Sequence, residues 1–274
     1  MCPLHSPFQN KNQPSGFAGF FHPADQPSPP AAFQLENFAE ISASRLHKVK
    51  SCANLIDEKM ATRIILIRHG ETIWNREHRC QGSSDIPLSD IGQTQAEALA
   101  VALKNFPLAA VYSSDLVRAR KTAEIVAAPH RLQVAQDARL RELNQGELEG
   151  DSLKDLLAGH PDLLKLWMNA PADVAMPGGE SMRALQARAV RAIDDIVRQH
   201  PDQTAAVIAH NLCNLAIVCH YLSLDLNRFR ALRMDNASIA ELEFSGRHTV
   251  LLRINDTHHL NDTHRLPNRR HSSS

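Results

Sequence analysis

Between residues 62 and 254, short apolar runs alternate with longer stretches in which apolar residues recur every three or four positions. The short runs are rich in β-branched and small residues, which is typical of strands buried on both faces of a parallel sheet. The longer stretches have the spacing of amphipathic helices. The alternation predicts a three-layer α/β sandwich, with a mainly parallel sheet, helices on both faces and a final antiparallel hairpin. The predicted strands are 62–67, 109–112, 205–209, 238–244 and 249–254, and the predicted helices are 89–105, 115–127 with Ser114 as its cap, 152–168, 180–199 and 212–222.

The two ends of the chain lack this periodicity. Seven of the 15 prolines lie in residues 1–30 and six of the nine phenylalanines lie before Met60, a distribution that does not build a core. We therefore predict a disordered Pro/Phe-rich extension over 1–59, one domain over 60–256, and a flexible tail over 257–274 with a duplicated Asn-Asp-Thr-His motif. The extension is interpreted either as dispensable, with translation able to start at Met60, or as an arm that recruits a partner.

Composition excludes several classes of partner. Lys plus Arg and Asp plus Glu are both 30, so the formal net charge is zero and gives no broad field for nucleic acid or an anionic membrane. The longest apolar run, 98–103, is far shorter than the ~20 residues of a membrane helix. Five cysteines without a C-x-x-C pair fit neither a disulfide framework nor a zinc site, and they predict a cytoplasmic protein without bound metal.

Charged and polar residues follow the predicted strands at their carboxyl ends. Arg68, His69 and Gly70 follow the first strand, His210 follows strand 205–209, and Arg118 lies in the first turn of the helix after strand 109–112. The carboxyl ends of parallel strands share one edge, so these residues are expected to line one crevice. One guanidinium group can bind two phosphate oxygens at once, and Gly70 permits a close approach of the backbone to the ligand. The sequence thus predicts a compact phosphate site.

These residues belong to a longer series of motifs. The segment Leu66–Thr72, followed by Trp74 and Asn75, resembles the signature of the histidine phosphatase superfamily, which includes the cofactor-dependent phosphoglycerate mutases. The resemblance covers 62–254. Its further matches are Gln81-Gly82, Asp85–Ser89, Ser113–Leu116 with Arg118-Ala119 and Thr122-Ala123, Leu140–Leu143 with Gly146 and Glu149-Gly150, and Ala209-His210.

The resemblance implies a covalent mechanism without metal or cofactor. His69 would attack phosphorus and form a phosphohistidine, while Arg68, Arg118 and His210 stabilise the charge on the phosphoryl oxygens. Glu142 matches the family's proton donor, which protonates the leaving alcohol and then activates water. The remaining residues expected to bind substrate or phosphate are Asn75, Gln81, Gly82 and Asn211.

Two of these residues have an alternative interpretation. Glu142 could form a salt bridge with Arg139 or Arg141 in place of an acid–base role. Asn211 stands where many members have glycine, so it is interpreted either as a contact to the substrate or as the cap of the helix that starts near 212.

The motifs favour a phosphomonoester hydrolase that acts on a small phosphorylated metabolite. Only 67 residues separate Glu142 from His210, without the long insertion of the mutases, and residues 151–180 are expected to cap the site and select the substrate. Five leucines of this cap, at 156, 157, 163, 164 and 166, are expected to be mostly packing residues. The alternatives are a 2,3-bisphosphoglycerate-dependent phosphoglycerate mutase and a non-catalytic binding module. A homodimer is the oligomer to test.

Overall fold

The computed structural model describes residues 61–246 and 248–260. The predicted extension 1–59, the start at Met60 and the second copy of the duplicated motif lie outside the described residues. Beyond the predicted boundary at 256, Leu260 is buried and packs in the core, so at least this residue past the boundary contributes to the fold. The domain boundaries themselves stay a prediction.

The described chain forms one six-stranded sheet in the order β3-β2-β4-β1-β5-β6. The central pair, β1 and β4, is parallel, as are β4 with β2 and β2 with β3. The last two strands form an antiparallel hairpin beside β1. The predicted mainly parallel sheet with a final antiparallel hairpin is confirmed. The strands are β1 (Thr62–Arg68), β2 (Leu108–Ser113), β3 (Val134–Gln136), β4 (Thr204–Ala209), β5 (Ile239–Ser245) and β6 (His248–Asp256).

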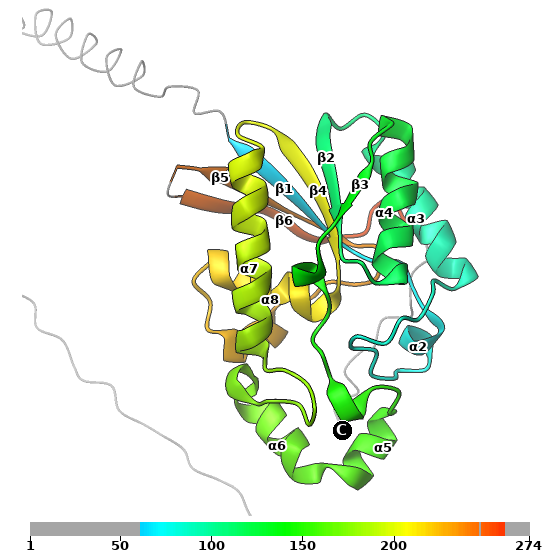
Figure 1. The fold of residues 1–274 in the computed structure, drawn as a ribbon, viewed down its shortest axis with the longest axis vertical. Coiled ribbons are helices and arrows are strands. Elements are labelled where there is room, and N and C mark those ends of the chain that lie inside the picture. The colour runs from blue at the N-terminus through cyan, green and yellow to red at the C-terminus, as the bar shows by residue number, and fades with distance from the viewer. Residues whose placement is uncertain (1–60, 247, 261–274) are drawn as a thin grey trace, which may run out of the picture. The chain divides into compact units, whose positions relative to one another are not determined.

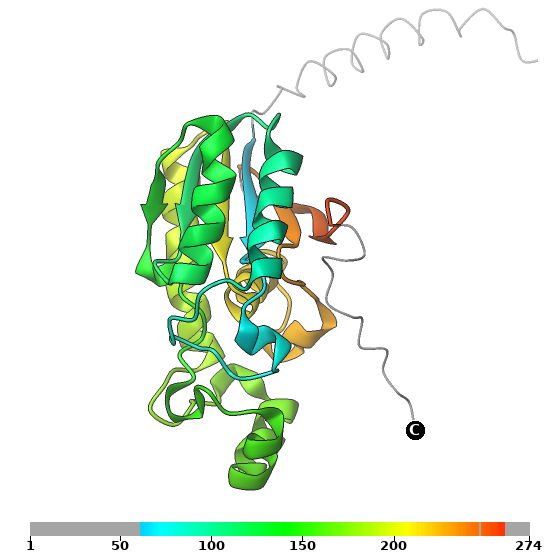
Figure 2. The ribbon, with the colours of Figure 1, turned by 90° about the vertical axis from the view of Figure 1, so that its right-hand side faces the viewer.

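Helices cover both faces of this sheet, which confirms the three-layer sandwich (Figures 1 and 2). Because side chains alternate along a strand, Ile64 and Leu66 of β1 pack in one core and Ile65 and Ile67 in the other. The first core contains residues of α7 and α8, and the second contains residues of α3 and α4. The helices are α2 (Ile73–Arg76), α3 (Asp90–Leu103), α4 (Val117–Ala127), α5 (Leu153–Gly159), α6 (Pro161–Asn169), α7 (Met182–Gln199) and α8 (Asn211–Tyr221).

Two predicted helices differ from those observed. Helix α4 begins at Val117 with Leu116 in the N-cap position, so the predicted cap by Ser114 is wrong; Ser114 Oγ instead accepts a hydrogen bond from the Leu116 amide. The predicted helix 152–168 is two helices, because Pro161 starts α6 and its ring disfavours a helical conformation at the preceding residue, His160. Strand β3, helix α2 and several short 3-10 helices, among them Leu226–Ala231, were not predicted.

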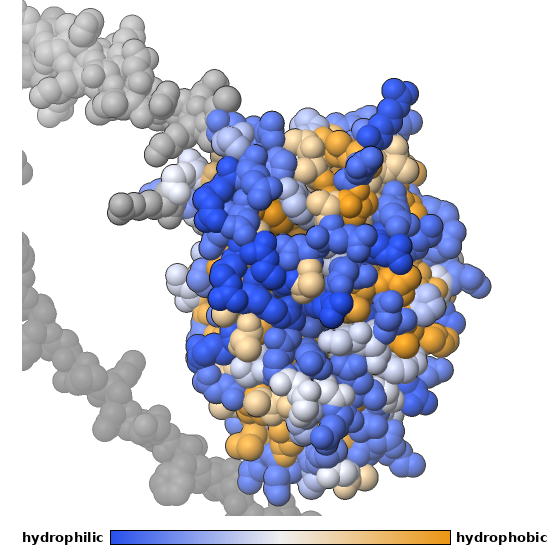
Figure 3. Space-filling model, in the orientation of Figure 1, coloured by the Kyte–Doolittle hydropathy of each residue, from blue (hydrophilic) through white to orange (hydrophobic). Residues whose placement is uncertain are grey.

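Helices α5 and α6 lie beyond the end of the sheet at which β1 and β4 finish (Figures 1 and 2). Their outer surface is partly apolar, since Leu166 and Met168 of α6 are 58% and 63% exposed. Figure 3 shows apolar surface at the lower left, where Figure 1 draws α6. In the described part of the chain, no helix has the length and apolarity needed to cross a membrane.

Candidate active site

The two histidines of the predicted site follow neighbouring parallel strands. Arg68 at the end of β1 lies in register with Ala209 at the end of β4, and the His69 amide donates to the Ala209 carbonyl at 3.0 Å. His69 and His210 are therefore adjacent, with ring centroids 5.1 Å apart. The expectation that the strand ends bring these residues together holds for this pair.

Gly70 allows the chain leaving β1 to lie directly on helix α3. A Cβ atom at Gly70 would stand 2.3 Å from the carbonyl oxygen of Gly92, and one at Gly92 would stand 2.0 Å from the carbonyl oxygen of Glu71. Both distances are below van der Waals contact, so neither position accepts a side chain without movement of the backbone. This contact fixes the backbone immediately after His69.

The His69 ring is held in one orientation. Its Nδ1 atom lies 2.6 Å from the carbonyl oxygen of Gly70, which can only accept, so Nδ1 carries the proton and Nε2 keeps its lone pair. Burial, together with the positive charges of Arg118 and Arg68, holds the pKa of His69 well below its usual value. His69 is thus a neutral imidazole, the form that acts as a nucleophile.

His210 is buried behind the same group of charges. Burial, with the charges of Arg118, His69, Arg188 and Arg68, lowers its pKa well below the usual value. Neither ring nitrogen has a hydrogen-bond partner in the described residues, which is costly for a fully buried imidazole. His210 does not itself line the cavity that contains His69.

Two arginines supply positive charge beside His69. Arg68 donates from Nη1 to the carbonyl of Met234 at 2.8 Å, and Arg118 donates to the carbonyls of Ser84 and Gly82 at 2.7 and 2.8 Å. Neither forms an ion pair with a described residue, and the Nε atom of each is buried without a partner. Burial lowers the pKa of Arg118 to about 10, which leaves it charged at neutral pH. Both charges are therefore available to an anion.

A network of amides surrounds the other side of His69. Asn75 Oδ1 accepts from the Thr72 amide at 3.1 Å and from Asn236 Nδ2 at 3.1 Å, which leaves its own NH₂ group as the donor. Gln81 Oε1 accepts from the Thr72 hydroxyl at 2.9 Å. Asn236 also donates to the His69 carbonyl at 3.2 Å. Asn236 was not predicted, because it lies in a stretch without helical or strand periodicity and no local pattern marks it.

Glu142 lies at the N-terminus of helix α8. Its carboxylate accepts hydrogen bonds from the amides of Leu143, Leu212 and Cys213 at 2.9, 3.2 and 3.2 Å. The positive end of the α8 dipole adds to this stabilisation of the carboxylate. Glu142 is thus oriented by main-chain groups from two segments that are far apart in the sequence.

The alternative interpretations of Glu142 and Asn211 are settled by these contacts. Arg139 pairs with Asp137 and Asp195, and Arg141 pairs with Asp115, so the alternative of a salt bridge to Glu142 is wrong, and its acid–base role stays a prediction. Asn211 is the first residue of α8 and makes no side-chain cap hydrogen bond, so its predicted capping role is wrong as well. Asn211 lines the cavity, which leaves the contact to substrate as the prediction to test.

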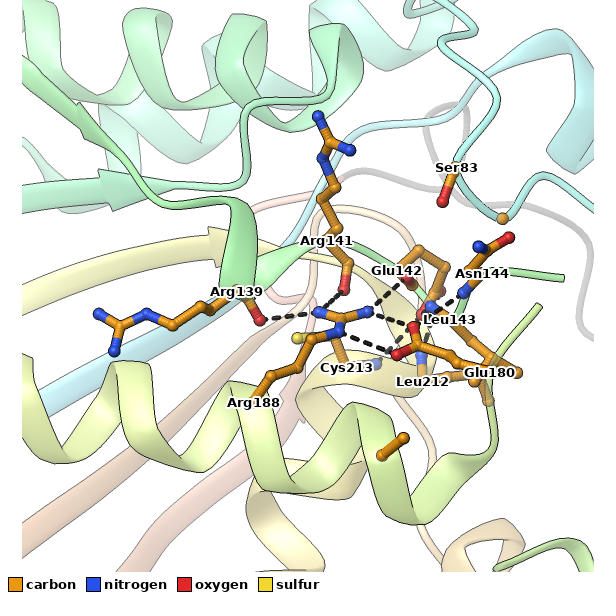
Figure 4. Close-up of polar contacts among 12 residues, drawn as sticks. Ser83, Arg139, Arg141, Glu142, Leu143, Asn144, Glu180, Arg188, Leu212 and Cys213 are labelled. Carbon is orange, nitrogen blue, oxygen red and sulfur yellow. Dashed lines mark hydrogen bonds and ion pairs between the residues drawn. The ribbon is translucent and has the colours of Figure 1, made fainter. Parts of the chain in front are cut away.

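An arginine of helix α7 holds the segment that carries Glu142 (Figure 4). Arg188 Nη1 donates to the carbonyls of Arg139 and Arg141 at 2.7 and 2.8 Å, and Nη2 donates to the carbonyl of Glu142 at 2.8 Å. Arg188 also forms an ion pair of 2.5 Å with Glu180, whose carboxylate accepts from the Asn144 amide. We call this the Arg188–Glu180 pair. It was not predicted, because its contacts with the segment of Glu142 join positions 36 to 49 residues apart.

One cavity of about 740 Å³ joins these groups to the cap, residues 151–180. At one end, which we call the phosphate end, it is lined by Arg68, His69, Asn75, Gln81, Gly82 and Arg118, with Glu142 and Asn211 beside them. The rest of the cavity, which we call the cap end, is lined largely by apolar side chains. These are Trp74, Leu148, Leu153, Leu156, Leu163, Leu164, Trp167, Met176, Leu212, Leu215, Phe229, Leu232 and Met234.

The leucines of the cap fall into two groups. Leu156, Leu163 and Leu164 line the cavity, whereas Leu157 and Leu166 are more than half exposed and lie outside the lining. The lining also includes Trp167. The interpretation of most of these leucines as packing residues is therefore correct only in part, since the three inward ones also form the wall of the site.

This arrangement is suited to attack on a phosphate monoester. It combines a neutral imidazole with a free Nε2, two guanidinium groups that form no ion pair with a described residue, and a carboxyl group in the same cavity. Among the described residues, no group of three or more His, Cys, Asp or Glu side chains has the arrangement of a metal site.

Comparison with known proteins identifies the family. Residues 64–257 match the model of the histidine phosphatase superfamily, branch 1. Phosphoserine phosphatase 1 of Hydrogenobacter thermophilus is 32% identical over 73% of this chain and 95% of its own length. The probable phosphoglycerate mutase GpmB of Yersinia pestis is 34% identical over 66% of this chain and 84% of its own.

Solved structures agree with these matches. YhfR of Bacillus stearothermophilus superimposes with a TM-score of 0.70 at 32% identity, over 73% of this chain and 99% of its own. A mycobacterial glucosyl-3-phosphoglycerate phosphatase superimposes with a TM-score of 0.67 at 31% identity, over 71% and 99%. The predicted class of enzyme, a phosphatase that uses histidine chemistry, is confirmed. The chain belongs to branch 1 of the histidine phosphatase superfamily.

Proposed function

We propose that this protein hydrolyses small phosphomonoesters by forming and breaking a phosphohistidine at His69. The observation that carries the proposal is the state of the His69 ring, neutral and with Nδ1 fixed on the Gly70 carbonyl. The first step starts with Glu142 protonated: Nε2 attacks phosphorus, the bond from phosphorus to the ester oxygen breaks, and Glu142 gives its proton to the departing alcohol. The carboxylate that results is the form that the amides of Leu143, Leu212 and Cys213 stabilise.

In the second step, water attacks the phosphohistidine. Glu142, now ionised, takes a proton from that water, the bond between phosphorus and Nε2 breaks, and inorganic phosphate leaves with the imidazole neutral again. Arg68 and Arg118, with the NH₂ group of Asn75, Gln81 and the Gly82 backbone, bind the phosphoryl oxygens in both steps. We assign to His210 the stabilisation of the charge on the same phosphoryl oxygens, because its two ring nitrogens are buried without partners next to His69.

Replacement of His69 tests the proposal. With His69→Ala we expect hydrolysis of phenyl phosphate to fall to background, whereas His220→Ala, an exposed histidine at the end of α8, serves as the matched control. Acid-quenched wild-type enzyme given ³²P-labelled substrate should carry a label that is labile in acid and stable in base, and His69→Ala should carry none. Hydrolysis retained by His69→Ala would contradict the mechanism.

The relatives named as probable phosphoglycerate mutases support one alternative activity. A mutase would isomerise 3-phosphoglycerate faster than it hydrolyses it, and 2,3-bisphosphoglycerate would stimulate that reaction. We expect hydrolysis to dominate in this chain, and a direct assay of both products with and without 2,3-bisphosphoglycerate decides between the two.

The proposal includes the setting of the enzyme. We propose that it acts in the cytoplasm, without metal and without binding nucleic acid, which is supported by the free thiols of Cys80, Cys213 and Cys219 and by zero net charge. Activity should be unchanged by EDTA. A homodimer stays a prediction, and light scattering on the purified chain measures it.

A further inference from the structure

The wall of the cap end is mainly apolar, and the polar side chains that share it are His78, Arg79, Gln145, His160, Arg230, Arg233 and Asp235. Its apolar part is formed by leucines of α5 and α6, by Trp167, and by Phe229 and Met234 from the opposite side. A leaving group that enters this region exchanges water for apolar carbon, which favours apolar groups and disfavours polar ones.

Most of the charged side chains of this wall already form ion pairs. Arg79 pairs with Glu77, and Arg233 pairs with Asp235. Arg230 donates to the Trp167 carbonyl at 3.0 Å, and its guanidinium lies 4.6 Å from the centre of the Phe229 ring. An ammonium group would therefore find no unpaired carboxylate among the described residues of this wall, and a carboxylate would find only Arg230, whose charge already faces two aromatic rings.

The wall is also held in place by contacts that do not involve a ligand. The bond from Arg230 to Trp167 joins the 3-10 helix Leu226–Ala231 to α6, and the Asn227 side chain accepts from the Ala172 amide at 3.0 Å just after α6. The Trp167 and Phe229 rings lie 5.9 Å apart. A wall fixed from both sides is a pre-formed surface, which loses little entropy on binding.

The size of the cavity points to a large leaving group. At about 740 Å³ it falls in the upper part of the range for small-molecule sites, roughly 300–1,000 Å³. A phosphoryl group with a three-carbon alcohol would leave most of the apolar wall in contact with water.

From these observations we infer that the substrate is a phosphomonoester of a bulky, mainly apolar alcohol, such as a long aliphatic or an aromatic one. The inference rests on the proposed function and adds the class of leaving group. It differs from the polar compounds in the names of two similar proteins, phosphoserine and glucosyl-3-phosphoglycerate.

A homologous series of alkyl phosphates tests the inference with the full chain. Ethyl, butyl, hexyl and octyl phosphate share nearly the same leaving-group chemistry, so differences in kcat/KM report contact of the alkyl chain with the cavity. Below micelle-forming concentrations we expect kcat/KM to rise about tenfold for every two methylenes until the cavity is filled. Hexyl phosphate should exceed phosphoserine and 3-phosphoglycerate.

A matched pair of variants on α6 connects the slope of this series to the wall. Leu163 lines the cavity, whereas Leu166 is 58% exposed on the same helix and lies outside the lining. We expect Leu163→Asn to flatten the dependence on chain length and Leu166→Asn to keep the wild-type slope. The slope compares substrates on one enzyme preparation, so a change in the folded fraction does not alter it.

Two outcomes would overturn the inference: a flat alkyl series in the wild type, or a slope that responds equally to Leu163→Asn and Leu166→Asn. Phenyl phosphate separates this failure from that of the proposed function. If phenyl phosphate is hydrolysed only when His69 is present but the alkyl series is flat, the class of leaving group is wrong and the mechanism stands. If His69→Ala hydrolyses phenyl phosphate at the wild-type rate, the mechanism is wrong.

Discussion

At the phosphate end of the cavity, His69 follows the end of a parallel strand and Arg118 lies in the first turn of a helix, and main-chain carbonyls hold both side chains. His69 follows β1, His210 follows β4, and Arg118 lies in the first turn of α4. At the cap end much of the lining comes from short helices, which are held by side-chain packing and by hydrogen bonds of the Arg230 and Asn227 side chains. The sheet thus positions the reacting groups, whereas the cap shapes the part of the cavity that receives the leaving group. Substitutions at the phosphate end should lower kcat/KM for all substrates, and substitutions at the cap end should lower it selectively.

The largest effect is expected from Arg118 at the phosphate end. Arg118→Met removes a charge that no described carboxylate pairs with, so kcat/KM should fall by about 100-fold or more for every substrate alike. Arg120→Met, on the same helix but partly exposed and paired with Glu124, is the control and should change kcat/KM less than twofold. A loss that depends on the size of the leaving group would contradict the division between the two ends.

A smaller and more selective effect is expected from the Arg188–Glu180 pair, which positions the segment of Glu142 without touching the cavity. Proton donation matters most when the leaving alcohol is a poor leaving group. Arg188→Met should therefore lower kcat/KM by about 10- to 100-fold for an alkyl phosphate and by only a few-fold for p-nitrophenyl phosphate. Arg191→Met, an exposed residue of α7, is the control. Equal losses on both substrates would indicate a purely structural role.

The buried histidines should make stability depend on pH. Their pKa values are lowered in the folded state, so below their usual value of 6.5 the unfolded chain binds protons that the folded chain does not. Stability is therefore complete above the usual pKa and falls as the pH drops below it, by up to about 1.4 kcal/mol per histidine for each pH unit. Urea unfolding between pH 7.5 and 5.5, without phosphate in the buffer, measures this loss. A wild-type curve independent of pH in this interval would contradict the neutral state of His69 and His210.

The smallest effect is expected from Arg230 at the cap end. Its contacts are the cation–π interactions with Phe229 and Trp167 and one hydrogen bond, at a partly exposed site. Arg230→Met should lower the melting temperature by a few degrees at most, since exposed cation–π contacts contribute about 0.5–1 kcal/mol. The turnover of ethyl phosphate under the same conditions should change less than that of octyl phosphate. If the turnover of ethyl phosphate changed more than that of octyl phosphate, Arg230 would act at the phosphate end.

Local patterns in the sequence predicted the parts of the site that depend on strand ends. The runs before His69 and His210 mark buried strands, and the rule that ligands bind at the carboxyl ends of parallel strands then brings both residues together. Asn236 and Arg188 escaped prediction, because their roles depend on which distant main-chain groups they reach. A pattern of apolar positions carries no information about such contacts.

The cap shows a different limit of sequence reasoning. Pro161 indicates the break between α5 and α6 in the sequence. The prediction of one helix over 152–168 gave more weight to the helical periodicity than to this proline. Which leucines face the cavity depends on how the broken helices dock on the sheet. Leu163 and Leu166 have the same chemistry and lie three residues apart, yet only Leu163 lines the site.

The base of the cap has a consequence for engineering and for divergence within the family. Asn144 and Glu180 exchange two hydrogen bonds, one from the Asn144 amide to the Glu180 carboxylate and one from the Glu180 amide to the Asn144 carbonyl. The chain therefore leaves the sheet domain at Asn144 and returns to it at Glu180, two positions that are adjacent in space. Residues 145–179 are thus a contiguous insertion in the sheet domain, but Glu149 also accepts hydrogen bonds from Ser83 and Ser84. An exchange of this segment between relatives would have to keep that contact, because Ser83 directly follows the phosphate-end residues Gln81 and Gly82.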